Sequence, residues 1–103
     1  MTNMTDAALD AELLDIARRL IEMESVSPED SGCQQLIAEY LLELGFEMEH
    51  MPFGDVSNLW ATHGQGAPYF VFAGHTDVVP PGPIDQWQSP PFQATETNGQ
   101  LFG

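Results

Sequence analysis

The sequence predicts an α/β fold, because two amphipathic helices precede a run of short strands. Over residues 6–24, apolar side chains recur every three or four positions, at Leu9, Leu13, Ile16, Leu20 and Met23. A second stripe of this kind covers residues 32–44, and after Gly45 the apolar period changes to two, which is typical of a strand. A chain of 103 residues is long enough for one small domain.

Residues at the ends of both helices support these assignments. Thr5 is placed to cap the first helix, and Pro28 prevents the helix from continuing far beyond its expected end. Ser31 and Gln34 have the spacing of a capping box at the start of the second helix. Gly45 supplies a left-handed stop at its end.

The strands are expected to form one mixed sheet. Residues 46–50 alternate between apolar and acidic side chains, which indicates a strand with one wet face. Residues 69–74 show no alternation, so we expect this strand to be covered on both faces. The remaining strands are predicted at 58–62, at 92–97 and, after a turn at Asn98-Gly99, at 100–102.

Composition excludes several classes of function. The 16 acidic residues against two basic ones give a formal net charge of −14, which repels phosphate backbones and anionic lipids, so we expect no nucleic-acid and no membrane partner. The single cysteine, Cys33, allows neither a disulfide framework nor a thiolate metal cluster. The longest apolar run, residues 69–73, is far shorter than the roughly 20 residues that span a bilayer. The first residues resemble no secretory signal, so a cytoplasmic location is expected.

The strongest chemical signal is His75-Thr76-Asp77, directly after the third predicted strand. In extended chain, residues two apart project to the same side, so His75 and Asp77 can face one space. The imidazole could bind a divalent metal while Asp77 accepts a hydrogen bond from its other nitrogen, or the pair could act as a general base. No serine or cysteine lies in a recognisable nucleophile elbow, which favours metal binding. The structural alternative is that His75 satisfies backbone groups at a strand end and Asp77 caps the turn.

Longer motifs extend this signal to nearly the whole chain. The segment FAGHTDVVPPG at 72–82, followed by Trp87 and SPPF at 89–92, resembles the dinuclear zinc amidohydrolases of the aminoacylase and carboxypeptidase superfamily. The order and spacing of four further segments also match: SVSPEDSGCQ (25–34), LGFEME (44–49), NLWA (58–61) and LFG (101–103). The stretch around Cys33 and the double proline before Phe92 narrow the resemblance to one amino-acid-biosynthetic group within the superfamily.

The resemblance implies a fold, a cofactor and two residue roles. Residues 1–103 would form the N-terminal part of a zinc-aminopeptidase-like catalytic domain that hydrolyses an amide in a small-molecule substrate. His75 would bind one of two Zn²⁺ ions per subunit, with Co²⁺ as a possible substitute, and Asp77 would serve catalysis by orienting that histidine. The other ligands, the general-base glutamate and the dimerisation domain of a homodimeric enzyme match nothing in residues 1–103, so we expect this chain to be incomplete and inactive alone.

Two alternatives stay open at this point. One is another deacetylase or peptidase of the same superfamily, since substrate-selecting residues match nothing here. The other is a non-catalytic α/β remnant or interaction module. Among the other candidate residues, His50 and His63 are expected to be structural or solvent-facing, and Cys33 to be a small buried thiol.

Overall fold

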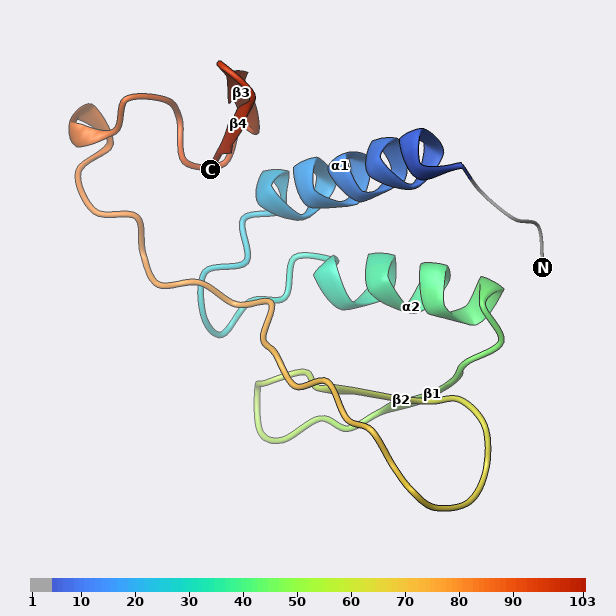
Figure 1. Cartoon of the computed structure of the whole chain (residues 1–103). Helices are drawn as coiled ribbons and strands as arrows, with labels where there is room; N and C mark the ends of the chain where they lie inside the picture. Colours follow the sequence, from blue (N-terminus) through green and yellow to red (C-terminus); the bar gives the residue numbers. More distant parts are fainter. Residues whose placement is uncertain (1–4) are drawn as a thin grey trace. The chain divides into compact units, whose positions relative to one another are not determined.

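A computed structural model describes residues 5–103, which divide into two compact units (Figure 1). One unit joins the N-terminal segment up to Glu24 with residues 81–103. The other is formed by residues 25–80. The chain therefore passes between the units twice, at Glu24-Ser25 and within the proline pair Pro80-Pro81, and each unit is described separately.

The first unit begins with helix α1, Asp6–Glu22. The hydroxyl of Thr5 accepts a hydrogen bond from the backbone N–H of Ala8 at 3.2 Å, which confirms the predicted N-cap. The helix ends two residues before the predicted boundary, at Met23, whose extended backbone (ψ 112°) no longer continues the helical turn. Both the existence and the start of this helix are thus confirmed.

The first unit also contains a hairpin of β3, Thr95–Thr97, and β4, Gln100–Phe102. The two strands are antiparallel, and the turn between them has positive φ at both Asn98 (51°) and Gly99 (75°), as a type I′ turn requires. The hairpin is confirmed, although β3 begins three residues later than predicted. An ion pair between Arg18 and Glu96 connects the hairpin to α1. A short 3-10 helix, η1, covers Ile84–Gln86 in the proline-rich segment.

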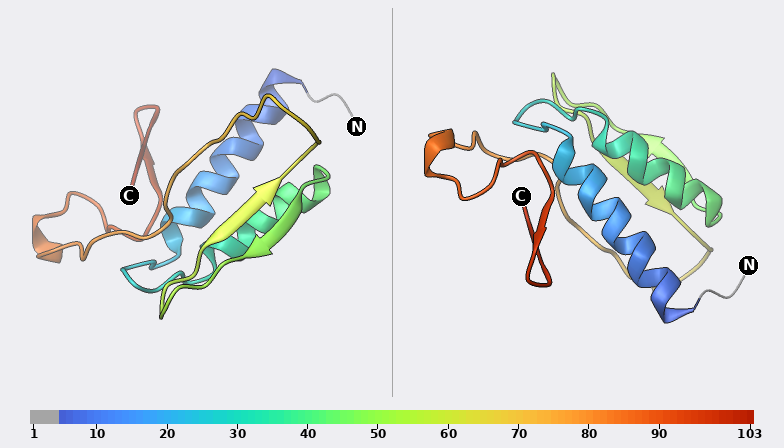
Figure 2. Two further views of the ribbon diagram at one scale, coloured as in Figure 1. Left: turned by 90° about the horizontal axis from the view of Figure 1, so that it is seen from below. Right: turned by 90° about the horizontal axis from the view of Figure 1, so that it is seen from above.

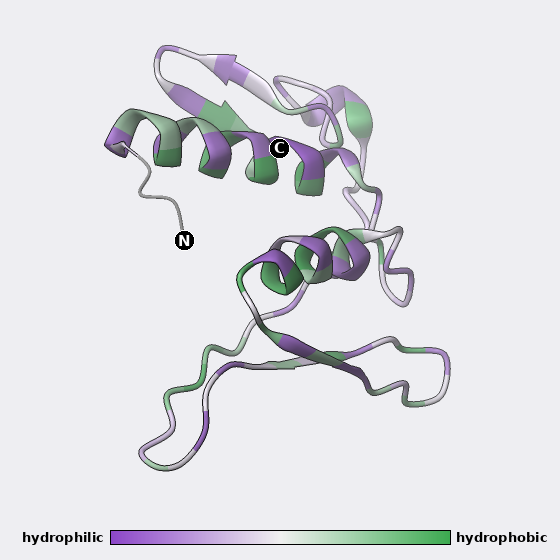
Figure 3. Ribbon diagram, turned by 90° about the vertical axis from the view of Figure 1, so that its right-hand side faces the viewer, coloured by the Kyte–Doolittle hydropathy of each residue, from purple (hydrophilic) through white to green (hydrophobic). Residues whose placement is uncertain are grey.

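The apolar face of α1 is only partly covered, with Leu9 and Leu13 exposed and Ile16 and Leu20 half-buried. No α1 residue is buried, and Leu9 and Leu13 are 49% and 67% exposed. Hydrophobic residues recur along the helix in Figure 3, as the periodicity predicts. The amphipathic pattern therefore identified the helix correctly, but the described residues bury its apolar face only in part.

The second unit is built from helix α2, Cys33–Glu43, and the hairpin of β1, Glu47–His50, with β2, Leu59–Thr62. The strands pair antiparallel, with Glu47 opposite Thr62 and His50 opposite Leu59. Helix α2 lies against this hairpin in both views of Figure 2. The buried residues of α2 are Cys33, Leu36 and Ala38.

The start of α2 corrects the predicted capping box. Ser31 has a positive φ of 55°, so the N-cap position falls on Gly32, which has no side chain to donate or accept. The carboxylate of Asp30 takes over and accepts the backbone N–H of Gln34 at 3.1 Å. At the other end the prediction is confirmed, because Gly45 is left-handed (φ 89°) and its N–H donates to the carbonyl of Leu42 at 3.0 Å.

The predicted third strand and the single mixed sheet are wrong. Residues 69–74 pair with no strand in the described chain, and Tyr69, Phe70 and Phe72 are 79%, 84% and 90% exposed. The physical reason is that a strand needs a hydrogen-bonding neighbour, and each of the two hairpins pairs only within itself. The structure holds two separate antiparallel hairpins and one isolated parallel bridge, between Val26 and Val78. The α/β composition is confirmed in this coarser form.

Candidate metal site at His75 and Asp77

The structure brings His75 and Asp77 together, as their spacing predicts. The Nδ1 atom of His75 lies 3.1 Å from Oδ1 of Asp77 and 2.9 Å from the backbone carbonyl oxygen of the same residue. Because both neighbours are acceptors, Nδ1 carries the proton in the neutral ring, which leaves the Nε2 lone pair free. The His75 side chain is 82% exposed, so this lone pair is open to an incoming ligand.

The carboxylate of Asp77 is held from both sides. Its Oδ1 atom faces the ring of His75, and its Oδ2 atom accepts a hydrogen bond from the hydroxyl of Ser27. The Ser27 hydrogen bond, followed by the charge and hydrogen bond of His75, holds the pKa of the Asp77 carboxyl below its ordinary value. The carboxylate is therefore ionised at neutral pH and available to polarise the imidazole.

The backbone around the pair is fixed by contacts some 50 residues away in sequence. Ser25 is 3% exposed, and its hydroxyl donates to the carbonyl oxygen of Thr76 at 2.7 Å. The Thr76 hydroxyl donates to Oδ1 of Asp30 at 3.3 Å, so Thr76 turns away from the space that His75 and Asp77 share. The arrangement thus has the alternation that extended chain imposes.

A cleft adjoins the pair within the same unit. Its volume is about 1440 Å³, and strand β2 and residues 68–77, including both His75 and Asp77, form much of its wall. Residues 69–74 line this cleft without pairing to any strand within residues 5–103. The imidazole therefore borders a space large enough for a small-molecule ligand.

The donor set fits one ligand position of a zinc site. A neutral imidazole nitrogen is a usual zinc ligand, and an acid on its other nitrogen is the usual outer partner. Within residues 5–103, no three His, Cys, Asp or Glu side chains converge to hold a metal ion. The described chain accordingly offers His75 as one ligand with its outer partner Asp77.

The remaining candidates, His50, His63 and Cys33, belong to no group of three metal-ligating side chains within residues 5–103. The ring of His63 packs against that of Phe46, with centroids 5.0 Å apart, and His50 is the last residue of β1. Cys33 is 1% exposed and forms no disulfide, which confirms the prediction of a small buried thiol.

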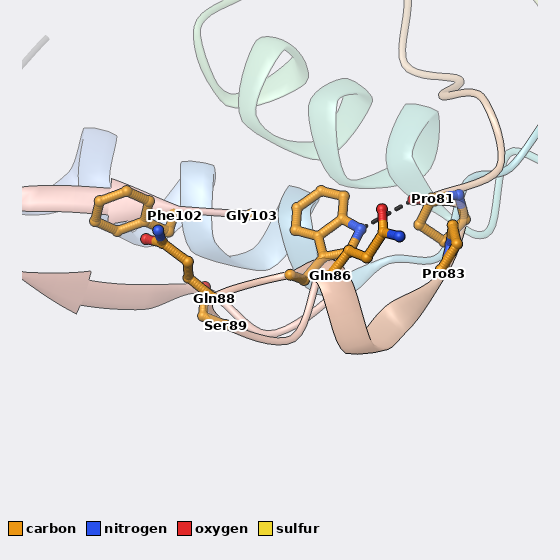
Figure 4. A pocket seen from close by; sticks show the side chains of 8 residues that line it. Pro81, Pro83, Gln86, Gln88, Ser89, Phe102 and Gly103 are labelled. Carbon is orange, nitrogen blue, oxygen red and sulfur yellow. Dashed lines mark hydrogen bonds between the residues drawn. The ribbon is translucent and has the colours of Figure 1, made fainter.

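A second cavity, in the first unit, lacks catalytic chemistry. It measures about 410 Å³ and is lined by Pro81, Pro83, Gln86, Trp87, Gln88, Ser89, Phe102 and Gly103 (Figure 4). The indole N–H of Trp87 donates to the carbonyl oxygen of Pro81 at 2.9 Å. None of the lining side chains is ionisable, and Trp87 serves to hold the proline-rich segment.

Sequence reasoning missed the residues that support Asp77. Ser27, Ser25 and Asp30 lie far from the histidine in sequence, and the expected role of their segment was to end one helix and begin the next. The serines at alternate positions in SVSP were the available signal, since two hydroxyls two residues apart in extended chain can hold one neighbouring segment.

The chain is similar to several curated proteins that carry the same name. No protein-family model matches the chain. The chain is 56% identical over 95 residues to a protein of Pseudoalteromonas atlantica, 57% identical over 93 residues to one of Thioalkalivibrio sulfidiphilus, and 52% identical over 93 residues to one of Coxiella burnetii. These alignments cover 90–92% of this chain and 25% of each relative, so the chain spans about a quarter of their length.

The motifs predicted a class of amide-hydrolysing enzymes, and the names of these relatives agree with that class. All three relatives are named succinyl-diaminopimelate desuccinylase. The chain is homologous to these desuccinylases over nine-tenths of its length. A separate observation is that no helix among the described residues is both long and apolar enough to cross a membrane.

Proposed function

We propose that this chain forms part of a zinc-dependent amidohydrolase that converts N-succinyl-LL-2,6-diaminopimelate to succinate and LL-diaminopimelate. The observation that carries the proposal is identity of 52–57% to proteins named succinyl-diaminopimelate desuccinylase, extending over 90% or more of the chain. This reaction would serve the biosynthesis of diaminopimelate and lysine. The amide hydrolysis itself would need further groups, because the chain spans a quarter of the relatives' length.

In this proposal His75 binds one of two Zn²⁺ ions through Nε2, and Co²⁺ could replace zinc. A bound zinc supplies Lewis acidity toward the amide carbonyl and lowers the pKa of a water molecule. Asp77 keeps the proton of the ring on Nδ1 and raises the basicity of Nε2 as a ligand. The geometry that supports these roles is the 3.1 Å contact between Nδ1 and Oδ1 together with the exposed ring.

The chain alone is expected to be inactive. A catalytic zinc usually takes three protein ligands, and His75 would be one of them. The complete enzyme is proposed to be a cytoplasmic homodimer without nucleic-acid or membrane partners, in agreement with the net charge of −14. Calorimetric titration of the 103-residue chain with zinc is expected to show no binding tighter than that of free imidazole. A stoichiometric submicromolar site would contradict this expectation.

The proposed substrate is tested by comparing two amides. The full-length protein that carries this chain should hydrolyse N-succinyl-LL-2,6-diaminopimelate with a higher kcat/KM than N-acetylornithine, and the variant His75→Ala serves as the inactive control. Preference for acetylornithine would assign the protein to a deacetylase of the same superfamily. A lack of hydrolysis of either compound, with normal folding, would instead favour a non-catalytic α/β module.

A further inference from the structure

Residues 25–27 run parallel to residues 76–78 and hold them at two backbone positions. The N–H of Val78 donates to the carbonyl oxygen of Ser25 at 2.9 Å, and the N–H of Ser27 donates to the carbonyl oxygen of Val78 at 3.0 Å. These two hydrogen bonds form the isolated parallel bridge between Val26 and Val78. The bridge places the alternate side chains of one segment beside the residues that follow His75.

The two serines of this segment then act on different groups. The buried hydroxyl of Ser25 donates to the carbonyl oxygen of Thr76 at 2.7 Å and so fixes the backbone between His75 and Asp77. The hydroxyl of Ser27 donates to Oδ2 of the Asp77 side chain and so fixes the carboxylate. Only the second contact reaches a group that touches the imidazole.

The assignment of the two carboxylate oxygens follows from this contact. A carboxylate can rotate about its terminal torsion and present either oxygen to a neighbour. With Oδ2 held by the Ser27 hydroxyl, Oδ1 remains on the side of His75 and accepts from Nδ1 at 3.1 Å. The Asp77 side chain is 49% exposed, so water competes for both oxygens whenever the serine contact is absent.

We propose that Ser27 is a positioning residue for the metal site: its hydroxyl fixes the Asp77 carboxylate, which fixes the His75 ring in the tautomer that leaves Nε2 free. The inference rests on the proposed function, since it gives the serine a role only if Nε2 of His75 binds a metal. It adds a third group, 50 residues away in sequence, to the histidine and aspartate.

The test reads the tautomer of His75 directly, without metal. In the 103-residue chain, the nitrogen chemical shifts of the neutral ring give the ratio of the Nδ1–H to the Nε2–H form. The loss of one exposed hydrogen bond in Ser27→Ala should lower this ratio about threefold to tenfold, and Ser27→Thr, which keeps the hydroxyl, should restore it. The matched control is Ser57→Ala, because Ser57 is an exposed serine of the same unit whose hydroxyl makes no hydrogen bond within residues 5–103.

A double-mutant cycle separates positioning from a general effect on the fold. In an Asp77→Ala background, Ser27→Ala should leave the tautomer ratio unchanged, because the carboxylate that links the serine hydroxyl to the ring has been removed. An equal change in both backgrounds, or an unchanged ratio in the single variant, would overturn the proposal.

The same cycle can be measured as zinc affinity in the full-length protein if the short chain associates during the measurement. Ser27→Ala should weaken zinc binding about threefold to tenfold in the presence of Asp77 and not at all in its absence. Undiminished affinity in Ser27→Ala would overturn the inference alone. Undiminished metal content in His75→Ala would instead refute the proposed function.

Discussion

Replacing the Asp77 carboxylate separates its charge from its hydrogen bond. Asp77→Asn keeps an acceptor oxygen for Nδ1 of His75 but removes the negative charge, whereas Asp77→Ala removes both. In either variant the backbone carbonyl oxygen of residue 77, which lies 2.9 Å from Nδ1, still accepts the ring proton. The preference of the ring for the Nδ1–H tautomer should therefore be weakened but not abolished. The loss of zinc affinity should lie within the range usual for outer partners of a metal ligand.

The magnitude follows from that partial redundancy. Loss of an outer partner typically lowers metal affinity about 10- to 100-fold, which corresponds to about 1.4 to 2.7 kcal/mol. We expect Asp77→Asn to lie near the lower value, because the hydrogen bond survives, and Asp77→Ala to lie higher without exceeding the upper value. Competition with a chelator measures the zinc affinity of each full-length variant.

The control for total charge is Asp55→Asn. Asp55 is exposed, belongs to the same unit, and has no hydrogen bond or ion pair within residues 5–103. Its replacement should leave zinc affinity unchanged. Zinc binding by Asp77→Asn as tight as that of the wild type would contradict this prediction. A loss of zinc affinity of more than about 1000-fold in Asp77→Ala would contradict it as well, since the backbone carbonyl would then not be holding the ring.

Three further predictions concern acidity, association and stability. Because its pKa is lowered in the folded state, Asp77 contributes stability above its unfolded pKa of about 3.9, and this contribution is lost as pH falls through the lower folded pKa. Carboxyl-carbon NMR should show the Asp77 pKa rising in Ser27→Ala, and an unchanged pKa would mean that the serine hydroxyl does not stabilise the carboxylate. The exposed segment 69–74 should drive self-association of the 103-residue chain, and Phe72→Glu, at a position 90% exposed, should shift its sedimentation toward the monomer. A monomeric wild-type chain would contradict this prediction. Leu36 is 3% exposed, so Leu36→Ala should lower the free energy of unfolding by about 2 to 5 kcal/mol in urea titration. Leu42 is 64% exposed, so Leu42→Ala should lower it far less, and equal losses would mean that α2 does not form the core.

Local signals in the sequence were sufficient for the helices and hairpins. Thr5 caps α1 and Gly45 ends α2 because each acts through atoms a few residues away. The turn at Asn98-Gly99 was likewise readable, since few residues other than asparagine and glycine tolerate positive φ. The capping box failed for a local reason as well, because the left-handed Ser31 moved the N-cap to Gly32.

Features that depend on distant partners could not be read in this way. The apolar run at 69–74 has the composition of a buried strand, but burial requires neighbours, and the described residues supply none. The contact between His75 and Asp77 was predictable because it spans two residues, whereas the hydroxyl of Ser27 reaches Asp77 only through the parallel bridge of Val26 with Val78.

We expect the imidazole of His75 to donate an electron pair to a zinc ion. The decisive measurement is the zinc content of full-length His75→Ala, determined by elemental analysis beside the wild-type protein and the control His50→Ala. The His75 variant is expected to lose about one zinc ion per chain together with its turnover, while the His50 variant keeps both. Full zinc content and full turnover in His75→Ala would contradict it.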